Sequence, residues 1–187
     1  MGRWEPDARS RLEEAALFCY FTNGFDQTTV AEIAARAGLT ERTYFRHFAD
    51  KREVLFGGAV EFQGHITRAV ASAPSGMGPL DAALEGLAAA GALLQPWRSR
   101  AVQRNAVVTA NVELQERELV KLAGLALAIG GVLRDRGTPD AVARLTGEVA
   151  VAAFRTAFDR WVHADADTDL ATLVRASRDE LEVVTQR

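Results

Sequence analysis

The stretch that decides the fold runs from Thr29 to Lys51 and reads T-V-A-E-I-A-A-R-A-G-L-T-E-R-T-Y-F-R-H-F-A-D-K. Its apolar residues recur at helical spacing on both sides of the A-G-L turn at residues 37–39, which predicts two short helices joined tightly. Thr29 followed by Glu32 forms a capping box, and Thr40 is placed to cap the second helix. This arrangement is typical of a helix-turn-helix, whose second helix enters the major groove of DNA.

The second predicted helix has an inward and an outward face. Phe45 and Phe48, three residues apart, are expected to anchor it inward. The outward face would then carry basic, hydroxyl and aromatic groups, namely Arg42, Thr43, Tyr44 and Arg46. A guanidinium such as that of Arg42 offers a bidentate fork for guanine O6 and N7, while Arg46 is equally suited to a phosphate.

The charge of the chain is unevenly distributed. The 187 residues carry a formal net charge of -3, which is unusual for a protein that binds nucleic acid. Residues 36–52, however, contain five basic and two acidic side chains, a local charge of +3. An acidic chain with one basic face suits a DNA-binding protein whose contact surface is small.

The rest of the sequence predicts an all-α protein of about nine helices, because no alternating strand pattern is present. We expect a DNA-binding domain at residues 1–52, with its motif at 29–48, and a ligand-binding and dimerisation domain at 53–187. Asp50 and Glu53 form a further cap pair that predicts one long helix reaching Val70. No membrane-spanning segment or signal peptide is expected, which favours a cytoplasmic protein.

Residues 28–51, together with the preceding helix and the D-K-R-E-V-L sequence from Asp50, resemble the TetR family of transcriptional regulators. The resemblance is specific over residues 8–60 and only architectural beyond them. It implies a homodimer that binds a palindromic operator, usually represses a neighbouring gene, and is released when a small molecule fills a cavity in the helical body.

The resemblance also implies roles for individual residues. Thr29 and Thr40 would contact phosphates of the DNA backbone, and His47 and Lys51 would also bind phosphate. Bases or nearby phosphates would be contacted by Arg42, Thr43 and Tyr44. Many family members have tyrosine where this chain has Phe45, so Phe45 is assigned to packing and Tyr44 to the reading role.

Dimerisation follows from geometry, since two helix-turn-helix units must lie about 34 to 36 Å apart, or a multiple of one helical turn, to read two half-sites. The last two predicted helices, 139–162 and 170–184, carry the apolar stripes best suited to a four-helix interface, as the family arrangement also suggests. The candidate interface residues are Val149, Ala153, Phe158, Trp161, Leu173 and Leu181.

A ligand cavity is expected among the helices between residues 80 and 136. Its candidate lining residues combine apolar and orienting polar groups, and they are Phe62, His65, Trp97, Asn105, Thr109, Asn111 and Phe154. No cofactor is expected. The three histidines are scattered and lack the spacing of a metal site, so none is predicted.

The sequence also bears on two other classes of function. An enzyme is not expected, because the sequence holds no G-x-S-x-G, Walker-type G-K-[ST] or H-E-x-x-H motif. The alternative is a helical adaptor that binds a protein partner through its apolar seams and does not bind DNA. The sequence leaves open the operator, the regulated genes, the effector, and whether binding represses or activates.

Ligand response is expected to be a population shift. In this hypothesis the long helix that begins near Asp50 moves the two reading helices away from operator spacing. The apparent continuity of the sequence from Asp50 to Ala73 motivates it.

Overall fold

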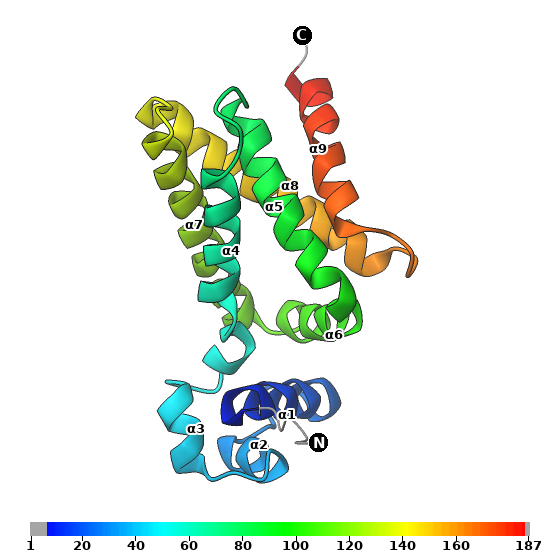
Figure 1. Cartoon of the computed structure of the whole chain (residues 1–187). Coiled ribbons are helices and arrows are strands. Elements are labelled where there is room, and N and C mark those ends of the chain that lie inside the picture. The colour runs from blue at the N-terminus through cyan, green and yellow to red at the C-terminus, as the bar shows by residue number, and fades with distance from the viewer. Residues whose placement is uncertain (1–6, 186–187) are drawn as a thin grey trace, which may run out of the picture. The chain divides into compact units, whose positions relative to one another are not determined.

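The computed structural model describes residues 7–185, and over this range the chain is helical and contains no strand (Figure 1). The helices are α1 (Ala8–Asn23), α2 (Val30–Arg36), α3 (Glu41–His47), η1 (Glu53–Phe56), α4 (Ala59–Ala71), α5 (Pro79–Leu94), η2 (Gln95–Trp97), α6 (Arg98–Thr109), α7 (Val112–Asp135), α8 (Asp140–His163) and α9 (Leu170–Thr185). The elements η1 and η2 are short 3-10 helices. The predicted all-α fold is confirmed.

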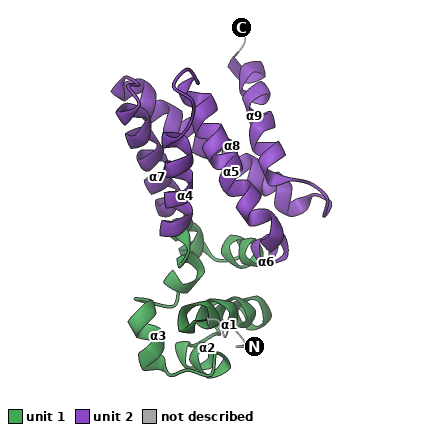
Figure 2. Ribbon diagram, in the orientation of Figure 1, with its two compact units in different colours: residues 1–59, 103–118 green, residues 60–102, 119–187 purple. Residues whose placement is uncertain are grey.

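The chain divides into two compact units (Figure 2). Unit 1 contains the described residues up to Ala59 together with residues 103–118, and unit 2 contains residues 60–102 and the described residues from Leu119 onward. Helices α6 and α7 are each divided between the units. The expected division into a DNA-binding domain at residues 1–52 and a second domain at residues 53–187 stays a prediction. The compact units are divided differently, because unit 1 also includes residues 103–118.

An apolar cluster forms the core of unit 1. Helix α1 supplies much of it, and Ile33 of α2 and Tyr44 of α3 pack in the same cluster. The segment 103–118 contributes the buried side chains Val107, Val108 and Leu114. Fully burying a side chain of this size stabilises a fold by roughly 1.5 to 3 kcal/mol, so this segment is part of the core that supports the helix-turn-helix.

Helix α1 is capped at both ends. The Asp7 carboxylate accepts a hydrogen bond of 2.8 Å from the backbone N–H of Ser10 and caps the first turn. At the other end Gly24 has φ +87° and its N–H donates to the carbonyl of Tyr20 at 3.0 Å. A left-handed residue after the last turn is a common way to end a helix, and glycine adopts it without steric cost.

The long helix predicted from Asp50 to Val70 is wrong. The Asp50 carboxylate does accept from the backbone N–H groups of Arg52 (2.7 Å) and Glu53 (3.1 Å), but it starts only the four-residue 3-10 helix η1. Helix α4 begins separately at Ala59, after Gly57 and Gly58. Two consecutive glycines are poor helix formers, which accounts for the interruption.

Unit 2 is built around α5, α8 and α9, which pack against one another. Trp161 of α8 is fully buried, and its indole N–H donates to the side-chain oxygen of Gln95 at 3.0 Å. The amide of Gln95 in turn donates to the carbonyl of Thr168 at 3.0 Å, and Arg98 donates to the carbonyl of Trp161 at 2.8 Å. These bonds hold the loop between α8 and α9 in place.

Helices α7 and α8 approach each other through glycine. A Cβ added to Gly147 would lie 2.3 Å from the carbonyl oxygen of Ala126, and one added to Gly130 would lie 3.2 Å from that of Ala143. The first distance is shorter than any real Cβ contact, so only glycine fits at position 147 without a shift of the backbone. Small residues thus set the close approach of these two helices.

Candidate nucleic-acid interface

Helix α2 is fixed at its start by the predicted capping box. The Thr29 hydroxyl accepts from the N–H of Glu32 at 3.2 Å, and the Glu32 carboxylate accepts from the N–H of Thr29 at 2.7 Å. The hydrogen bond from the Thr29 backbone lowers the pKa of Glu32 because it favours the ionised carboxylate.

The turn between α2 and α3 depends on glycine and on α1. Gly38 has φ +66°, a conformation that other residues rarely adopt. The Arg11 guanidinium donates to the carbonyl of Ala37, the last residue before it, and lies 2.8 Å from where a Cβ on Gly38 would be. Helix α1 therefore ties down the turn that sets the angle between α2 and α3.

Helix α3 is capped by Thr40 as predicted. The Thr40 hydroxyl accepts from the N–H of Thr43 at 3.2 Å, and the two hydroxyls lie 3.1 Å apart. The residues of α3 that remain exposed are Glu41, Arg42, Phe45 and Arg46, while Thr43 and His47 are half-buried. A guanidinium nitrogen of Arg46 is 3.5 Å from the Nε2 of His47.

The two aromatic residues of α3 have the opposite orientation to the one predicted. Tyr44 is fully buried, whereas 54% of Phe45 is exposed. The Tyr44 ring packs on Phe48 with centroids 5.4 Å apart, and its hydroxyl donates to the carbonyl of Asp50 at 3.1 Å. Burial raises the pKa of the Tyr44 phenol. Tyr44 is therefore a core residue and Phe45 an exposed one.

The helical period explains this correction. Phe48 is fixed inward at the end of α3, and both positions 44 and 45 lie near it at spacings of four and three. The spacing alone does not choose between them. The tyrosine is selected because its hydroxyl reaches the Asp50 carbonyl, an acceptor supplied by the loop after α3.

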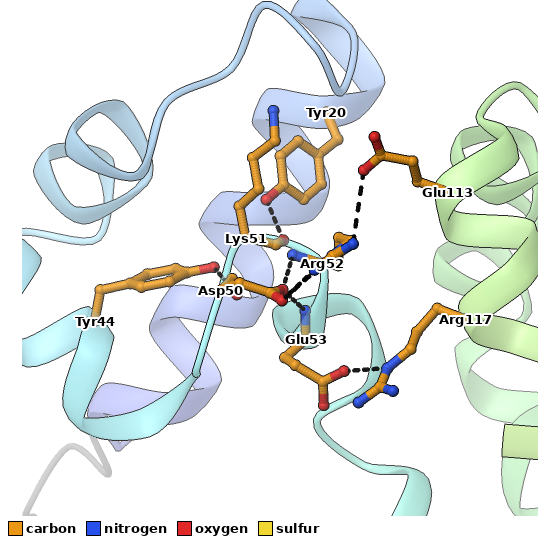
Figure 3. A network of polar contacts seen from close by, with 8 residues as sticks. All are labelled: Tyr20, Tyr44, Asp50, Lys51, Arg52, Glu53, Glu113 and Arg117. Atoms are coloured by element: carbon orange, nitrogen blue, oxygen red, sulfur yellow. Dashed lines mark hydrogen bonds and ion pairs between the residues drawn. The ribbon is translucent and has the colours of Figure 1, made fainter. Parts of the chain in front are cut away.

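Lys51, which is predicted to bind a DNA phosphate, also makes contacts within unit 1. Its ammonium group donates to the carbonyl of Phe25 at 3.0 Å and lies 4.2 Å from the centre of the Phe25 ring. The Lys51 carbonyl accepts from the hydroxyl of the buried Tyr20 at 2.5 Å (Figure 3). Lys51 joins the loop after α3 to the loop after α1, and its amine is occupied within unit 1.

A polar network connects this loop to α7 within unit 1 (Figure 3). The Asp50 carboxylate accepts from the Arg52 guanidinium at 2.8 Å, and this hydrogen bond holds the pKa of Asp50 below its ordinary value. Arg52 also lies 3.9 Å from Glu113, and Arg117 pairs with Glu53. The ion pairs with Glu113 and Arg117 place the start of α7 beside η1.

Comparison with known proteins agrees with this geometry. A family model described as bacterial regulatory proteins of the tetR family matches residues 12–56. The HTH-type transcriptional regulator TcmR of Streptomyces glaucescens is 35% identical over 74 residues, which are 40% of this chain and 33% of that protein. The amino-terminal part of this chain is therefore similar to regulators of the tetR family. Regulators of this family are DNA-binding transcription factors and not enzymes.

Solved structures share the fold of this chain. The fatty acid degradation regulator FadR of Bacillus halodurans superposes with a TM-score of 0.65 over 96% of each chain at 18% identity. FadR of Bacillus subtilis, solved in complex with stearoyl-CoA, gives 0.60 over 92% of this chain and 96% of that one at 20% identity. At such identities the similarity shows the fold alone. The match to TcmR covers about a third of that protein's length.

The predicted ligand-pocket residues are divided between the two units. Asn105, Thr109 and Asn111 belong to unit 1, and the other four belong to unit 2. In unit 2 the rings of Phe62 and Phe154 pack with centroids 6.1 Å apart. His65 and Trp97 are exposed. Within unit 2 the structure therefore brings Phe62 and Phe154 together, and the predicted pocket stays a prediction.

A cavity of about 400 Å³ lies within unit 1, and the sequence did not point to it. It is bordered by the end of α1, the loop that follows, and the turn between α6 and α7, and the residues lining it include Phe21, Asp26, Gln27, Ala106, Ala110 and Asn111. Of the predicted pocket residues, Asn111 alone borders it. Among the described residues no cluster of His, Cys, Asp or Glu is arranged to hold a metal ion.

The predicted dimer residues of α8 and α9 differ in exposure. Trp161 is fully buried and Ala153 nearly so, so neither presents a side chain to a partner. The half-buried candidates are Val149, Phe158, Leu173 and Leu181. Trp161 was misplaced because an apolar stripe alone does not distinguish a helix's own core from an interface.

Within the described range, no helix has the length and hydropathy needed to cross a membrane.

Proposed function

We propose that the chain binds operator DNA as a homodimer and regulates transcription, as a cytoplasmic repressor that a small-molecule effector releases. The observation that carries this proposal is the exposed face of α3, where Arg42 and Arg46 stand on a short helix capped by Thr40. Two guanidinium groups on a helix that fits the major groove are suited to guanine edges and phosphates. Further phosphate contacts are assigned to Thr29, Thr40, Thr43 and His47.

Salt-dependent binding to duplex DNA tests this proposal. Duplexes are first selected from a random pool, and the dissociation constant is then measured over a range of salt concentrations. Affinity should fall steeply with salt, with a slope of about 0.9 per phosphate contact in a double-logarithmic plot. A helical adaptor would show no duplex affinity at any salt concentration, and that result would overturn the proposal.

Variants of the two arginines sharpen the assignment. Arg42→Ala should cost about 1 to 3 kcal/mol on the preferred operator and relax base preference at one position of each half-site. Arg134→Ala removes an exposed arginine of α7 in unit 2 and serves as the matched control. Equal losses in both variants would show that only net charge matters, and Arg42 would then lose its reading role.

We assign dimerisation to α8 and α9, which leave apolar side chains exposed. Leu145 of α8 is 66% exposed. Val142 of the same helix and Val183 and Val184 of α9 are also exposed. Leu145→Glu should shift the chain toward monomer in size-exclusion chromatography with light scattering, and should weaken operator binding. Val60→Glu, at an even more exposed apolar position of α4, should leave the dimer intact. If the Leu145→Glu variant remained dimeric, the interface would have to lie elsewhere.

An effector is proposed for the helical body, where Phe62, Phe154 and Phe158 form a row of packed rings. Apolar pockets with few polar groups bind drug-sized and acyl ligands. Since a structural relative was solved with stearoyl-CoA, acyl-CoA thioesters are the first class to screen. A true effector should both raise the melting temperature and release the chain from its operator. Stabilisation without release would argue against an effector role.

The coupling between effector and operator is assigned to residues 103–118. These residues contribute to the core of unit 1, and they continue along α6 and α7 into residues of unit 2. They replace the continuous fourth helix as the proposed connection, because the chain breaks that helix at Gly57 and Gly58. Arg117→Gln removes the partner of Glu53 and should weaken the effector's influence on operator affinity, while both binding events persist. An unchanged response would exclude this route.

A further inference from the structure

Phe45 is a large apolar side chain on the exposed face of α3. The edge of the Tyr44 ring meets it with centroids 5.6 Å apart and an interplanar angle of 80°. Arg42 lies one helical turn before Phe45 and Arg46 directly follows it, and both are exposed. The ring therefore stands between two guanidinium-bearing residues on the face assigned to DNA.

Two other exposed phenylalanines of unit 1 lie beside features that Phe45 lacks. Phe18 of α1 is 47% exposed, but the Arg36 guanidinium lies 3.3 Å from its ring centre. Phe21 is 52% exposed and borders the unit 1 cavity. Phe45 has only the Tyr44 ring edge beneath it among the ring contacts described. Its exposure is not accounted for by packing within unit 1.

We infer that Phe45 is a specificity-determining residue that packs against the C5-methyl group of a thymine in the major groove, an inference that rests on the proposed DNA-binding function. That methyl is the apolar group that base edges display in the major groove, and phenylalanine is suited to it. A phenylalanine ring has no hydrogen-bond donor for a phosphate oxygen. Arg42 and Arg46 supply the positive charge that holds the ring against the duplex.

The expected effect follows from the apolar surface that the contact removes from water. Burying one methyl group contributes about 0.8 kcal/mol, which corresponds to roughly a fourfold change in affinity for each half-site. Replacing a thymine by deoxyuridine removes this methyl and leaves every hydrogen-bonding group of the base pair in place. The substitution therefore isolates the proposed contact.

The experiment combines this base change with protein variants. Duplexes selected with the full chain are substituted with deoxyuridine one thymine at a time, and dissociation constants are measured for the wild type, Phe45→Ala, Phe45→Leu and Phe21→Ala. Phe21 is the matched control because it is exposed to nearly the same extent and lies on α1. Circular dichroism melting of each variant verifies that the fold is intact.

We expect one thymine position in each half-site at which deoxyuridine weakens wild-type and Phe21→Ala binding about fourfold. The same change should have no effect on Phe45→Ala and an intermediate effect on Phe45→Leu, which keeps an apolar side chain. No sensitive position in the wild type, or equal sensitivity in wild type and Phe45→Ala, would overturn the inference while leaving DNA binding established. Failure to select any duplex would instead overturn the proposed function.

Discussion

Single residues decide the geometry of the reading face. Gly38 sets the turn before α3 by its positive φ, and Tyr44 sets the rotation of α3 by filling the core beneath it. Both are structural residues within a functional motif. If the wrong residue of α3 is taken as the buried one, every other side chain of the helix is placed on the wrong face, because rotating a helix about its axis moves all its positions together.

Gly38→Ala should destabilise the protein by about 1 to 3 kcal/mol. An alanine here would have to adopt the left-handed backbone conformation. Its Cβ would also meet the Arg11 guanidinium that donates to the Ala37 carbonyl. Urea unfolding measures the change. Gly58→Ala is the control, since its Cβ would meet nothing within 4 Å and its φ is not positive. A neutral Gly38→Ala would show that the turn has another accessible conformation.

Tyr44→Phe should cost about 0.5 to 1.5 kcal/mol, because the Asp50 carbonyl loses the hydrogen bond that the Tyr44 hydroxyl donates. Phe45→Tyr should change stability by less than about 0.5 kcal/mol, as expected for an exposed position. The two reciprocal changes, compared by chemical unfolding, test which ring is buried. The reverse order of effects would restore the orientation expected from the sequence.

At the scale of elements, capping was predictable and helix length was not. The caps at Thr29 and Thr40 lie within four residues of the groups they bind, so local sequence specifies them. The break after η1 depends on two glycines whose effect the apolar pattern concealed. Val54, Ile66 and Val70 are all buried, and their apolar pattern does not show that Val54 lies in a different helix from the other two.

Gly147→Ala should destabilise unit 2 by roughly 1 to 3 kcal/mol, since a methyl group 2.3 Å from the Ala126 carbonyl forces α7 and α8 apart. Gly124→Ala, on α7 with open space around it, should be neutral or stabilising by up to about 1 kcal/mol. Thermal unfolding of both variants measures the difference. A tolerated Gly147→Ala would mean that the crossing can widen at little cost.

The Asp50 cap gives a pH-dependent contribution. Its pKa is lowered in the folded state, chiefly by the hydrogen bond from Arg52, so the ionised carboxylate stabilises the fold above the ordinary value of 3.8. This stability should be lost as pH falls through the lowered folded value. The destabilisation caused by Asp50→Asn should therefore be constant from pH 7 to about 5 and shrink below about 4. Urea unfolding at each pH checks this, and a pH-independent difference would contradict it.

For the whole molecule, the sequence predicted fold class and motif but not the partition into units. Every signal in residues 28–51 is local, which is why the helix-turn-helix was recognisable. The placement of Val107, Val108 and Leu114 in the core of unit 1 depends on contacts across at least fifty residues of chain. No periodicity encodes such contacts. Pocket residues were scattered for the same reason.

The membership of residues 103–118 in unit 1 bears on engineering. An N-terminal fragment ending at Ala59 would lack three apolar side chains of its own core, so it should be less soluble and less cooperative in unfolding than the full chain. Refolding and solubility assays of that fragment, with and without a synthetic 103–118 peptide, would measure this. A chimeric regulator that joins unit 1 to the ligand-binding domain of another protein should therefore include two segments of this chain, the one up to Ala59 and residues 103–118.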